Sequence, residues 1–404
     1  MTKARLRREC ASLDQLRELI NKQASSSAVE TDQTKPPSRH PRWVRINTLR
    51  TTLDEQLQTT FSDYDRLANL SKLTQSTPDG TNKRLHLDDH IPNLLAIPPY
   101  IDLTTTKAYK QGHLILQDKA SCFPAHLLNP QHGEGDIIDA CAAPGNKTTH
   151  LAAILHTSST NGEDGDARSG KVIACEKDAL RSQTLEKMIR VAGGEDAIRV
   201  KAKQDFMKLD PMAKEFADVR SLLLDPSCSG SGIVGRDEGG VVVHLPSVTT
   251  AAEDEKLRGK KRKRKNGDGG TRTQPTSAPN PGIPPAEEVV EELPPSTEDT
   301  DTRLQTRLSN LSSFQLRLLQ RAMSFPSATR ITYSTCSIHA EENEHVVVRA
   351  LLSDIALERG WRIMKRSEQV EGMRKWHRRG WTGACRTVVG QERGEGCGVL
   401  MWRK

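Results

Sequence analysis

The chain has 404 residues and a formal net charge of +7. This length is enough for two or three domains and a sizeable core. The hydrophobic content of 35% is low for one compact globule, which predicts that part of the chain is disordered. The positive charge suits a polyanionic partner such as nucleic acid, although a merely soluble protein can have the same balance.

The eight cysteines occur singly, with no Cys-x-x-Cys pair. This spacing argues against a zinc site, so no metal is expected, and against the disulfide framework of a secreted protein. No apolar run approaches the length of a membrane span, and the first residues, Met1–Arg8, lack the apolar core of a signal peptide. We therefore expect an intracellular protein in a reducing compartment, with no membrane partner.

The first 130 residues predict a helix, a linker and a small α+β domain. Residues 1–40 combine apolar positions at helical spacing with a polar stretch rich in Ser, Thr and Pro, which is typical of a short helix and a linker. Residues 41–130 predict strands at Arg42–Leu49, Leu94–Ile97 and Leu114–Leu116, and helices at Thr52–Leu67 and Ser121–Leu128.

From Asp136 onward strands alternate with helices, which indicates an α/β fold with a parallel, doubly wound sheet. The predicted strands are Ile137–Asp139, Val172–Glu176, Ile198–Val200, Leu222–Asp225 and Arg330–Ser334, with Trp361–Met364 and Val399–Trp402 as closing strands. The predicted helices are Lys147–Leu155, Ala179–Val191, Ser312–Met323 and Val346–Leu357. Residues 131–404 therefore form the second predicted domain.

Residues from about 235 to 303 interrupt this alternation without any periodic apolar pattern. Because ordered connections are rarely this long, we interpret them as a disordered insertion in the second domain. The insertion contains the basic hexamer Lys260–Lys265, which fits a nuclear-import signal or a phosphate contact. A merely solvated charge run fits this composition equally well.

The turn from the first strand into the first helix, Asp139–Thr148, is rich in small residues. Small residues let the backbone approach a ligand, and the helix N-terminus offers N–H groups to a carboxylate or phosphate. A Walker A loop requires adjacent Gly and Lys and an earlier glycine, but Asn146 separates Gly145 from Lys147 and Ala140 occupies the earlier position. The Gly-x-Gly-x-x-Gly fingerprint is also absent, which argues against ATP and NAD.

Polar residues close five separate apolar strands, at Asp139, Glu176, Asp205, Asp225 and Cys336. Singly, each acid is more often a turn or cap residue, and Cys336 alone is more often a buried structural cysteine. Because parallel strands end at one edge of a sheet, these side chains are expected to converge there. An acid such as Glu176 suits a ribose diol, so an adenosine-containing cofactor beside two cysteines indicates group transfer.

Three motifs then occur in the order found in a known family. They are Ala-Ala-Pro-Gly-x-Lys-Thr at 142–148, Asp-x-x-Cys-Ser-Gly-x-Gly at 225–232 and Ser-Thr-Cys-Ser at 334–337. From Pro41 to the C-terminus, apart from the insertion, the chain resembles the Sun/Nop-type RNA cytosine-C5 methyltransferases, to which the bacterial 16S rRNA enzyme RsmB belongs. The Asp-Pro-Ser-Cys form resembles the eukaryotic branch that modifies large-subunit ribosomal RNA.

The resemblance implies a Rossmann-like class I S-adenosylmethionine methyltransferase sheet preceded by a small α+β RNA-binding domain. It implies that Cys336 is the nucleophile, that Cys228 assists proton removal and release, and that Asp225 contacts the base or the methyl donor. It assigns S-adenosyl-L-methionine contacts to Cys141, Ala142, Ala143, Pro144, Gly145, Asn146, Lys147, Glu176, Arg181, Asp205 and Asp225. For Arg181, an ordinary surface position on its helix stays an open alternative.

The chemistry explains the need for a nucleophilic cysteine. Cytosine C5 is too weak a nucleophile to accept a methyl group unaided, and a thiolate that adds at C6 activates it. The pKa of Cys336 should therefore be lowered, with help from a helix that we expect to start at Ser337.

The resemblance therefore implies methylation of large-subunit rRNA in the nucleolus, by a monomer that acts on a pre-ribosomal particle. A methyltransferase of tRNA or another nucleic acid, and a noncatalytic ribosome-assembly factor, are the alternatives. The run Arg374–Arg379 fits an RNA contact or a solvated loop. Gly396–Val399 reads Gly-Cys-Gly-Val where relatives have Gly-Phe-Phe-Val, which puts the packing of the last strands in question.

Overall fold

The computed structural model describes residues 40–74, 83–160, 170–232, 297–376, 387–388 and 397–403. The helix and linker expected before residue 40 lie outside the described residues, as does most of the predicted insertion with its basic hexamer Lys260–Lys265. Of the basic run Arg374–Arg379, only the backbone of the first three residues is described.

The smaller of two sheets has the strand order β2-β3-β4-β1-β5. Its strands are β1 (Arg42–Ile46), β2 (Asp65–Arg66), β3 (Arg84–Leu87), β4 (Leu94–Ile97) and β5 (Leu114–Leu116), with the short helices α3 (Leu53–Gln58), α4 (Leu70–Thr74) and α5 (Lys107–Lys110). Strand β1 pairs antiparallel with both β4 and β5. A separate core forms around Val44, Leu85, Leu95 and Phe61.

The helix predicted over Thr52–Leu67 is wrong beyond Gln58, where α3 ends and the chain turns toward β2. Thr59 donates its hydroxyl to the Glu55 carbonyl at 2.7 Å, and Ser62 donates to the Thr59 carbonyl at 3.0 Å. Hydroxyl side chains that bond nearby backbone in this way compete with helix hydrogen bonds, so the helix stops although apolar residues continue.

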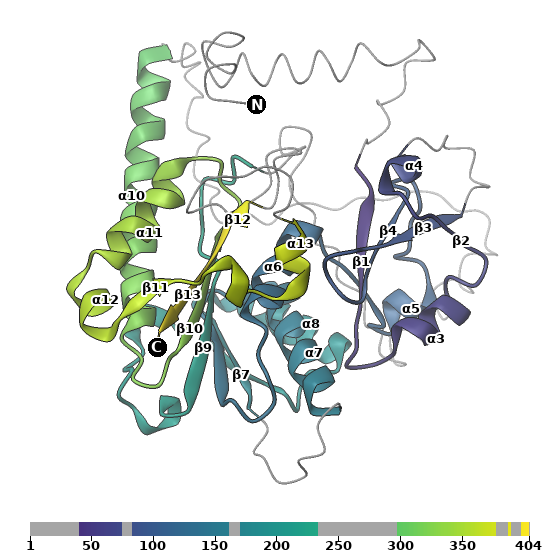
Figure 1. Ribbon diagram of the computed structural model, residues 1–404, viewed down its shortest axis with the longest axis horizontal. Helices are drawn as coiled ribbons and strands as arrows, with labels where there is room; N and C mark the ends of the chain where they lie inside the picture. Colours follow the sequence, from purple (N-terminus) through teal and green to yellow (C-terminus); the bar gives the residue numbers. More distant parts are fainter. Residues whose placement is uncertain are drawn as a thin grey trace, which may run out of the picture. The chain divides into compact units, whose positions relative to one another are not determined.

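The larger sheet has the order β11-β13-β10-β9-β6-β7-β8 (Figure 1), with β12 beside β13. Its strands are β6 (Asp136–Asp139), β7 (Val172–Glu176), β8 (Ile198–Ala202), β9 (Val219–Leu224), β10 (Arg330–Thr335), β11 (Trp361–Ile363), β12 (Thr387–Val388) and β13 (Cys397–Arg403). Five neighbouring strands, β10, β9, β6, β7 and β8, are parallel, whereas β13 runs antiparallel to β10 and β11. Counted from β6 without β12, the order is 3-2-1-4-5-7-6.

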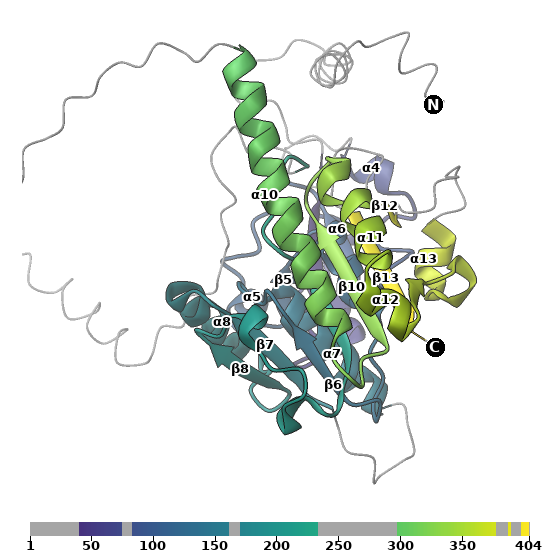
Figure 2. The same ribbon diagram turned by 90° about the vertical axis from the view of Figure 1, so that its left-hand side faces the viewer.

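Helices cover both faces of this sheet because successive strand residues point to opposite sides (Figures 1 and 2). Ile137 packs with α6 (Lys119–Leu128), α7 (Asn146–Thr160) and α8 (Ala179–Ala192). Its neighbour Ile138 belongs to the core with α10 (Thr297–Met323), α11 (Glu344–Leu351) and α12 (Asp354–Arg359). The remaining elements are α13 (Glu371–Trp376) and the 3-10 turns η1 (Phe206–Lys208), η2 (Lys214–Phe216), η4 (Ala340–Glu342) and η5 (Arg366–Glu368).

Two helix boundaries differ from the sequence expectation. Helix α10 begins at Thr297, inside the segment assigned to the insertion, and the single helix predicted over Val346–Leu357 is divided into α11 and α12. The division falls at Ser353, whose hydroxyl donates to the Ala350 carbonyl at 2.5 Å. The closing strand β13 does form, with Cys397 paired to Thr335.

Two arginines, one in β1 and one just after it, bind two of the helices that cover the larger sheet. The buried Arg45 donates to the Asn146 carbonyl at 3.3 Å and to Thr149 Oγ1 at 3.0 Å, both in the first turn of α7. Arg50 donates to the carbonyls of Arg190 and Val191 at 2.9 and 2.8 Å, at the end of α8. Carbonyls at a helix C-terminus lack partners within the helix, so Arg50 satisfies them.

Candidate active site

The loop between β6 and α7 combines a buried acid with a glycine that no other residue replaces easily. Asp139 ends β6 and accepts hydrogen bonds from Thr148 Oγ1 at 2.7 Å and from the Cys141 N–H at 3.4 Å. Gly145 has a φ of +112°, and a Cβ there would lie 3.0 Å from Met188. Both features fix the path of the 141–147 loop into the N-terminus of α7.

Burial raises the pKa of Asp139 to about 6, so this carboxylate destabilises the fold at neutral pH. The unfolded chain releases this proton near pH 4 and the folded chain near pH 6, so stability falls as pH rises through that window. Asp139→Asn should raise the free energy of unfolding at pH 7 by at most about 3 kcal/mol. Urea unfolding at pH 7 and pH 4 measures this; a gain that persists at pH 4 would contradict it.

The second strand brings Glu176 to the same loop. Glu176 is buried, and its carboxylate accepts the Asp178 N–H at 2.9 Å. Arg181 lies 3.5 Å from Glu176 and donates to the Ala143 carbonyl at 2.8 Å. Arg181 is thus not an isolated surface residue, because it connects the end of β7 to the 141–147 loop.

Asp205 follows β8 and caps the 3-10 turn η1, where it accepts the Met207 N–H at 2.9 Å. This is the ordinary capping role that a single acid after a strand most often has. A carboxylate has lone pairs beyond those that one N–H occupies, so the cap leaves acceptor capacity for a ligand hydroxyl.

Asp225 and Lys147 form an ion pair at the junction of β6 and β9. Their closest atoms, Lys147 Nζ and Asp225 Oδ2, are 2.8 Å apart. Ser334 donates to Asp225 at 2.6 Å, and Lys147 donates to Ser121 Oγ at 2.9 Å. Burial opposes the charge of Lys147, but the attraction of Asp225 outweighs it and raises the pKa of the ammonium. Sequence reasoning placed Ser334 in the Ser-Thr-Cys-Ser motif but gave neither serine a contact, since these contacts join distant segments of the chain.

The two cysteines predicted to react lie together at the ends of β9 and β10. Their sulfur atoms are 2.9 Å apart, and the Cys336 N–H donates to the Cys228 sulfur at 3.3 Å. The hydrogen bond from Cys228 lowers the pKa of Cys336 against the opposing effect of burial. The same hydrogen bond, together with burial, raises the pKa of Cys228. Within the pair, Cys336 is therefore the sulfur that loses its proton more readily.

The helix expected at Ser337 does not begin there. After Cys336 the chain makes a loop and the turn η4, and α11 starts only at Glu344. The Ser337 hydroxyl instead accepts a hydrogen bond from the Ser229 hydroxyl at 3.0 Å. The Gly232 N–H also donates to the Cys336 carbonyl at 2.8 Å, so the two cysteine-bearing turns are held together directly. The lowered pKa of Cys336 thus has a thiol partner as its main cause.

These pKa shifts predict selective alkylation. At pH 7 iodoacetamide should modify Cys336 faster than the buried Cys122 and Cys175, because burial raises the pKa of both to about 12. Peptide mass spectrometry over a pH series should give a midpoint for Cys336 below the ordinary cysteine value. In Cys228→Ala the midpoint should move upward; an unchanged midpoint would exclude Cys228 as the cause.

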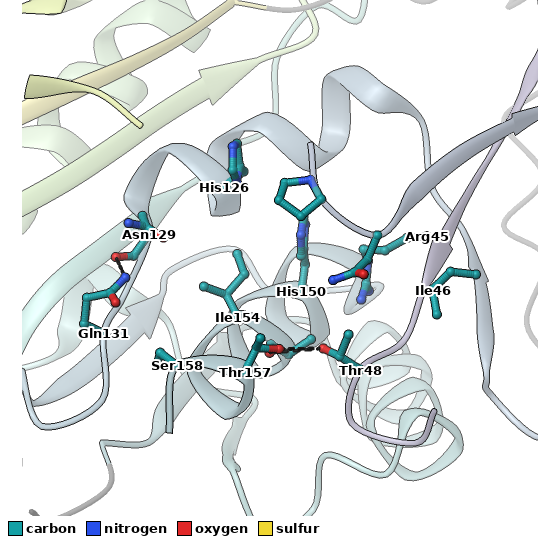
Figure 3. Close-up of a pocket in the computed structure, with 13 residues that line it drawn as sticks. Arg45, Ile46, Thr48, His126, Asn129, Gln131, His150, Ile154, Thr157 and Ser158 are labelled. Atoms are coloured by element: carbon teal, nitrogen blue, oxygen red, sulfur yellow. Dashed lines mark hydrogen bonds between the residues drawn. The ribbon is translucent and has the colours of Figure 1, made fainter. Parts of the chain in front are cut away.

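A cavity of about 230 Å³ lies elsewhere, between β1 and the outer face of α7 (Figure 3). Arg45 and Thr48 line one side of it, and His150, Ile154 and Thr157 of α7 line the other. Neither cysteine lines this cavity, so it is separate from the site at the sheet edge. Within the described residues, no group of three or more His, Cys, Asp or Glu side chains is arranged to hold a metal ion, and no helix is long and apolar enough to cross a membrane.

The sheet order, with its antiparallel seventh strand, defines a class I methyltransferase fold. The residues at its carboxyl edge add a cysteine pair to that fold. Residues 40–117 match the ferredoxin-like domain of NOL1/NOP2/Sun domain family member 5, and residues 125–246 match the 16S rRNA methyltransferase RsmB/F family. The chain therefore belongs to the RsmB/F-type, NOL1/NOP2/Sun family.

Several relatives support this membership. The chain is 38% identical to the 25S rRNA (cytosine-C(5))-methyltransferase rcm1 of Schizosaccharomyces pombe, over 78% of this chain and 52% of that protein. It is 34% identical to the 28S rRNA (cytosine-C(5))-methyltransferase of Mus musculus, over 77% of this chain and 52% of that protein. The chain thus spans about half the length of these curated relatives. A methyltransferase homologue from Pyrococcus horikoshii shares the fold, with a TM-score of 0.52 and 15% identity. The match covers 92% of this chain and 87% of that protein.

Proposed function

We propose that this chain methylates cytosine C5 in RNA with S-adenosyl-L-methionine, through a covalent bond between Cys336 and cytosine C6. One observation carries the proposal: the cysteine pair lies at the carboxyl edge of the sheet, within electrostatic range of Asp225 and Lys147. A thiolate and a thiol side by side supply a nucleophile and a second group that can move a proton.

The residues of the sheet edge fit the cofactor. Glu176 and Asp205 end neighbouring strands, and each keeps acceptor capacity for hydroxyl groups beside one backbone N–H contact. The segment Cys141–Lys147, including Ala142, Ala143, Pro144, Gly145 and Asn146, brings backbone to the start of α7, where Arg181 fixes it. When bound, S-adenosylmethionine supplies an electrophilic methyl group.

Cys336 adds as a thiolate to C6, and the electron pair of the C5–C6 double bond moves toward C5 and the ring. As this pair enters the ring, N3 takes up a proton from water, which it releases again when C5 is methylated. Asp225, fixed by Lys147 and Ser334, is placed to accept a hydrogen bond from this N3–H and so stabilise the adduct. Once C5 has been methylated, its C–H bond must break: that electron pair re-forms the double bond and the C6–S bond returns its pair to Cys336. Cys228, whose proton is no longer held by a Cys336 thiolate, gives that proton to water and then, as a thiolate, accepts the C5 proton directly or through water.

The proposed substrate is large-subunit ribosomal RNA, within a pre-ribosomal particle in the nucleolus of the nucleus, with a monomeric enzyme. The names of the fungal and mouse relatives support the substrate, and the ferredoxin-like domain at residues 40–117 supports the same branch of the family. The similarity to a human tRNA methyltransferase, at 34% identity, extends over only 30% of this chain, so tRNA is the weaker candidate.

The test offers large-subunit rRNA, small-subunit rRNA and tRNA to the purified chain with radiolabelled S-adenosylmethionine. Methylated products are then mapped by bisulfite sequencing. We expect label in large-subunit rRNA at a defined cytosine, and none with Cys336→Ala. Label in tRNA alone would make tRNA the substrate in place of large-subunit rRNA. Binding without methylation of any RNA would favour a noncatalytic assembly factor.

A further inference from the structure

Two fully buried side chains, Gln315 of α10 and Glu342 of η4, hold the backbone on both sides of Cys228. The Glu342 carboxylate accepts the N–H of Ser229, at 3.0 and 3.2 Å from its two oxygens. The Gln315 amide donates to the carbonyl of Ser227 at 3.0 Å. The residues directly before and after Cys228 are therefore both held by buried side chains of α10 and η4.

Gln315 and Glu342 also hold each other. The Gln315 Nε2 group donates to Glu342 Oε1 at 3.0 Å, and the Tyr333 hydroxyl lies 3.2 Å from Gln315 Oε1 and 2.5 Å from the Glu342 carbonyl. Because the Ser227 carbonyl and the Glu342 carboxylate can only accept, the amide must direct its NH₂ group toward both of them. The network thus has a single orientation, in which Glu342 only accepts.

A carboxylate is an expensive group for this position. Glu342 has no exposed surface, and among the described residues it forms no ion pair, although burying an unpaired charge costs several kcal/mol of solvation. Its N–H contacts offset part of that cost. Ser229 and Gln315 both donate to Glu342 Oε1 at 3.0 Å, and the Ser229 N–H also lies 3.2 Å from Oε2. A carboxylate suits the position, since an amide would set its NH₂ group against the Ser229 N–H.

The location of Glu342 links the two cysteines. Glu342 lies six residues after Cys336, on the segment that follows β10, and it clamps the turn that carries Cys228 after β9. We propose that Glu342, together with Gln315, is the positioning residue that keeps the Cys228 sulfur against Cys336 and thereby permits release of the methylated RNA. This inference rests on the proposed function, because release is a step of that reaction.

The experiment uses Glu342→Gln, which keeps the size of the side chain but sets a donor against a donor. Misplacement of a reacting group by about 1 Å can cost about 100-fold in rate, so we expect turnover to fall by up to about that factor. The covalent protein–RNA complex should accumulate on a denaturing gel, as it should in Cys228→Ala. Affinity for S-adenosylmethionine, measured by calorimetry, should stay within about twofold, because Glu342 contacts none of the loop residues.

Two further variants separate positioning from loss of stability. Exchange of the two side chains, in the double variant Glu342→Gln with Gln315→Glu, restores an acceptor opposite the amide, so part of the turnover should return and less complex should accumulate. Asp88→Asn is the matched control, because it makes the same change at another buried carboxylate, which pairs with Lys119 near the small sheet. It should lower thermal stability without trapping any complex.

The outcomes are distinct. Trapped complex in Glu342→Gln, reduced by the exchange variant and absent from Asp88→Asn, supports the inference. If Cys228→Ala traps the complex but Glu342→Gln turns over normally, or loses activity with no complex, Glu342 does not position Cys228 and the inference fails alone. If Cys228→Ala itself turns over normally with no complex, the proposed role of Cys228 fails and the inference fails with it.

Discussion

Cys336→Ala should lower methyl transfer to RNA by about 10⁴-fold or more, since loss of a covalent nucleophile leaves only binding and orientation effects. Cys228 should not replace it: the hydrogen bond to Cys336 is lost in this variant, but burial still raises the pKa of Cys228, so its thiol remains a poor nucleophile. The affinity for S-adenosylmethionine should stay within about twofold, because Cys336 follows β10 while the 141–147 loop follows β6. Filter binding of radiolabelled RNA product measures the first effect, and calorimetry measures the second.

Cys336→Ser is the matched control for this result, because it keeps the size and the hydrogen-bonding capacity of the side chain. A hydroxyl does not ionise near neutral pH, so it should fail to form the bond to C6 and should be as inactive as alanine. Measurable turnover in either variant would show that another residue attacks the base. That residue would then have to be Cys228, as expected for the DNA methyltransferases that use the cysteine of the turn after the fourth strand.

Cys228→Ala should behave in the opposite way and trap the intermediate. Cys336 remains able to attack C6, whereas removal of the C5 proton slows, so protein and RNA stay joined through the C6–S bond. We expect a slower band on a denaturing gel that contains both the chain and labelled RNA, with multiple turnover reduced by about 10²-fold to 10⁴-fold, the usual contribution of a general base.

Two controls define this band. It should disappear when Cys336→Ala is added to Cys228→Ala, because the bond to RNA then cannot form. It should also require an RNA that contains the target cytosine, so replacement of that cytosine by uridine at the mapped position removes it. A band that survives loss of Cys336 would reverse the roles assigned to the two cysteines.

Much of the site was predictable because parallel strands deliver their last residues to one edge. Asp139, Glu176, Asp225 and Cys336 each follow an apolar run, and the structure has them at the ends of β6, β7, β9 and β10. Local sequence carries this information, because strand ends are marked by the change from apolar to polar residues. The spacing of Gly145 within its loop likewise indicated a tight approach, and its positive φ agrees with that.

Local pattern failed where side chains compete with the backbone or where a distant element decides. The hydroxyls of Thr59 and Ser62 ended a helix that apolar spacing favoured. Ser337 resembles an N-cap in sequence, and its hydroxyl accepts the His339 N–H at 3.1 Å, but it also accepts from Ser229 across the site and no helix starts there. In both cases side-chain hydrogen bonds outweighed a weak helix preference.

The sequence by itself determined which motif follows which strand, that the 141–147 loop consists of small residues, and which two cysteines react in the proposal. Each of these depends on residues adjacent in the chain. Only the tertiary structure decided that Cys228 and Cys336 share a hydrogen bond. It also decided that Gln315 and Glu342 clamp the turn that carries Cys228. Gln315 and Glu342 are 27 residues apart, and Cys228 and Cys336 are 108 apart. Contacts over such separations are set by packing of the whole sheet, which no local pattern records.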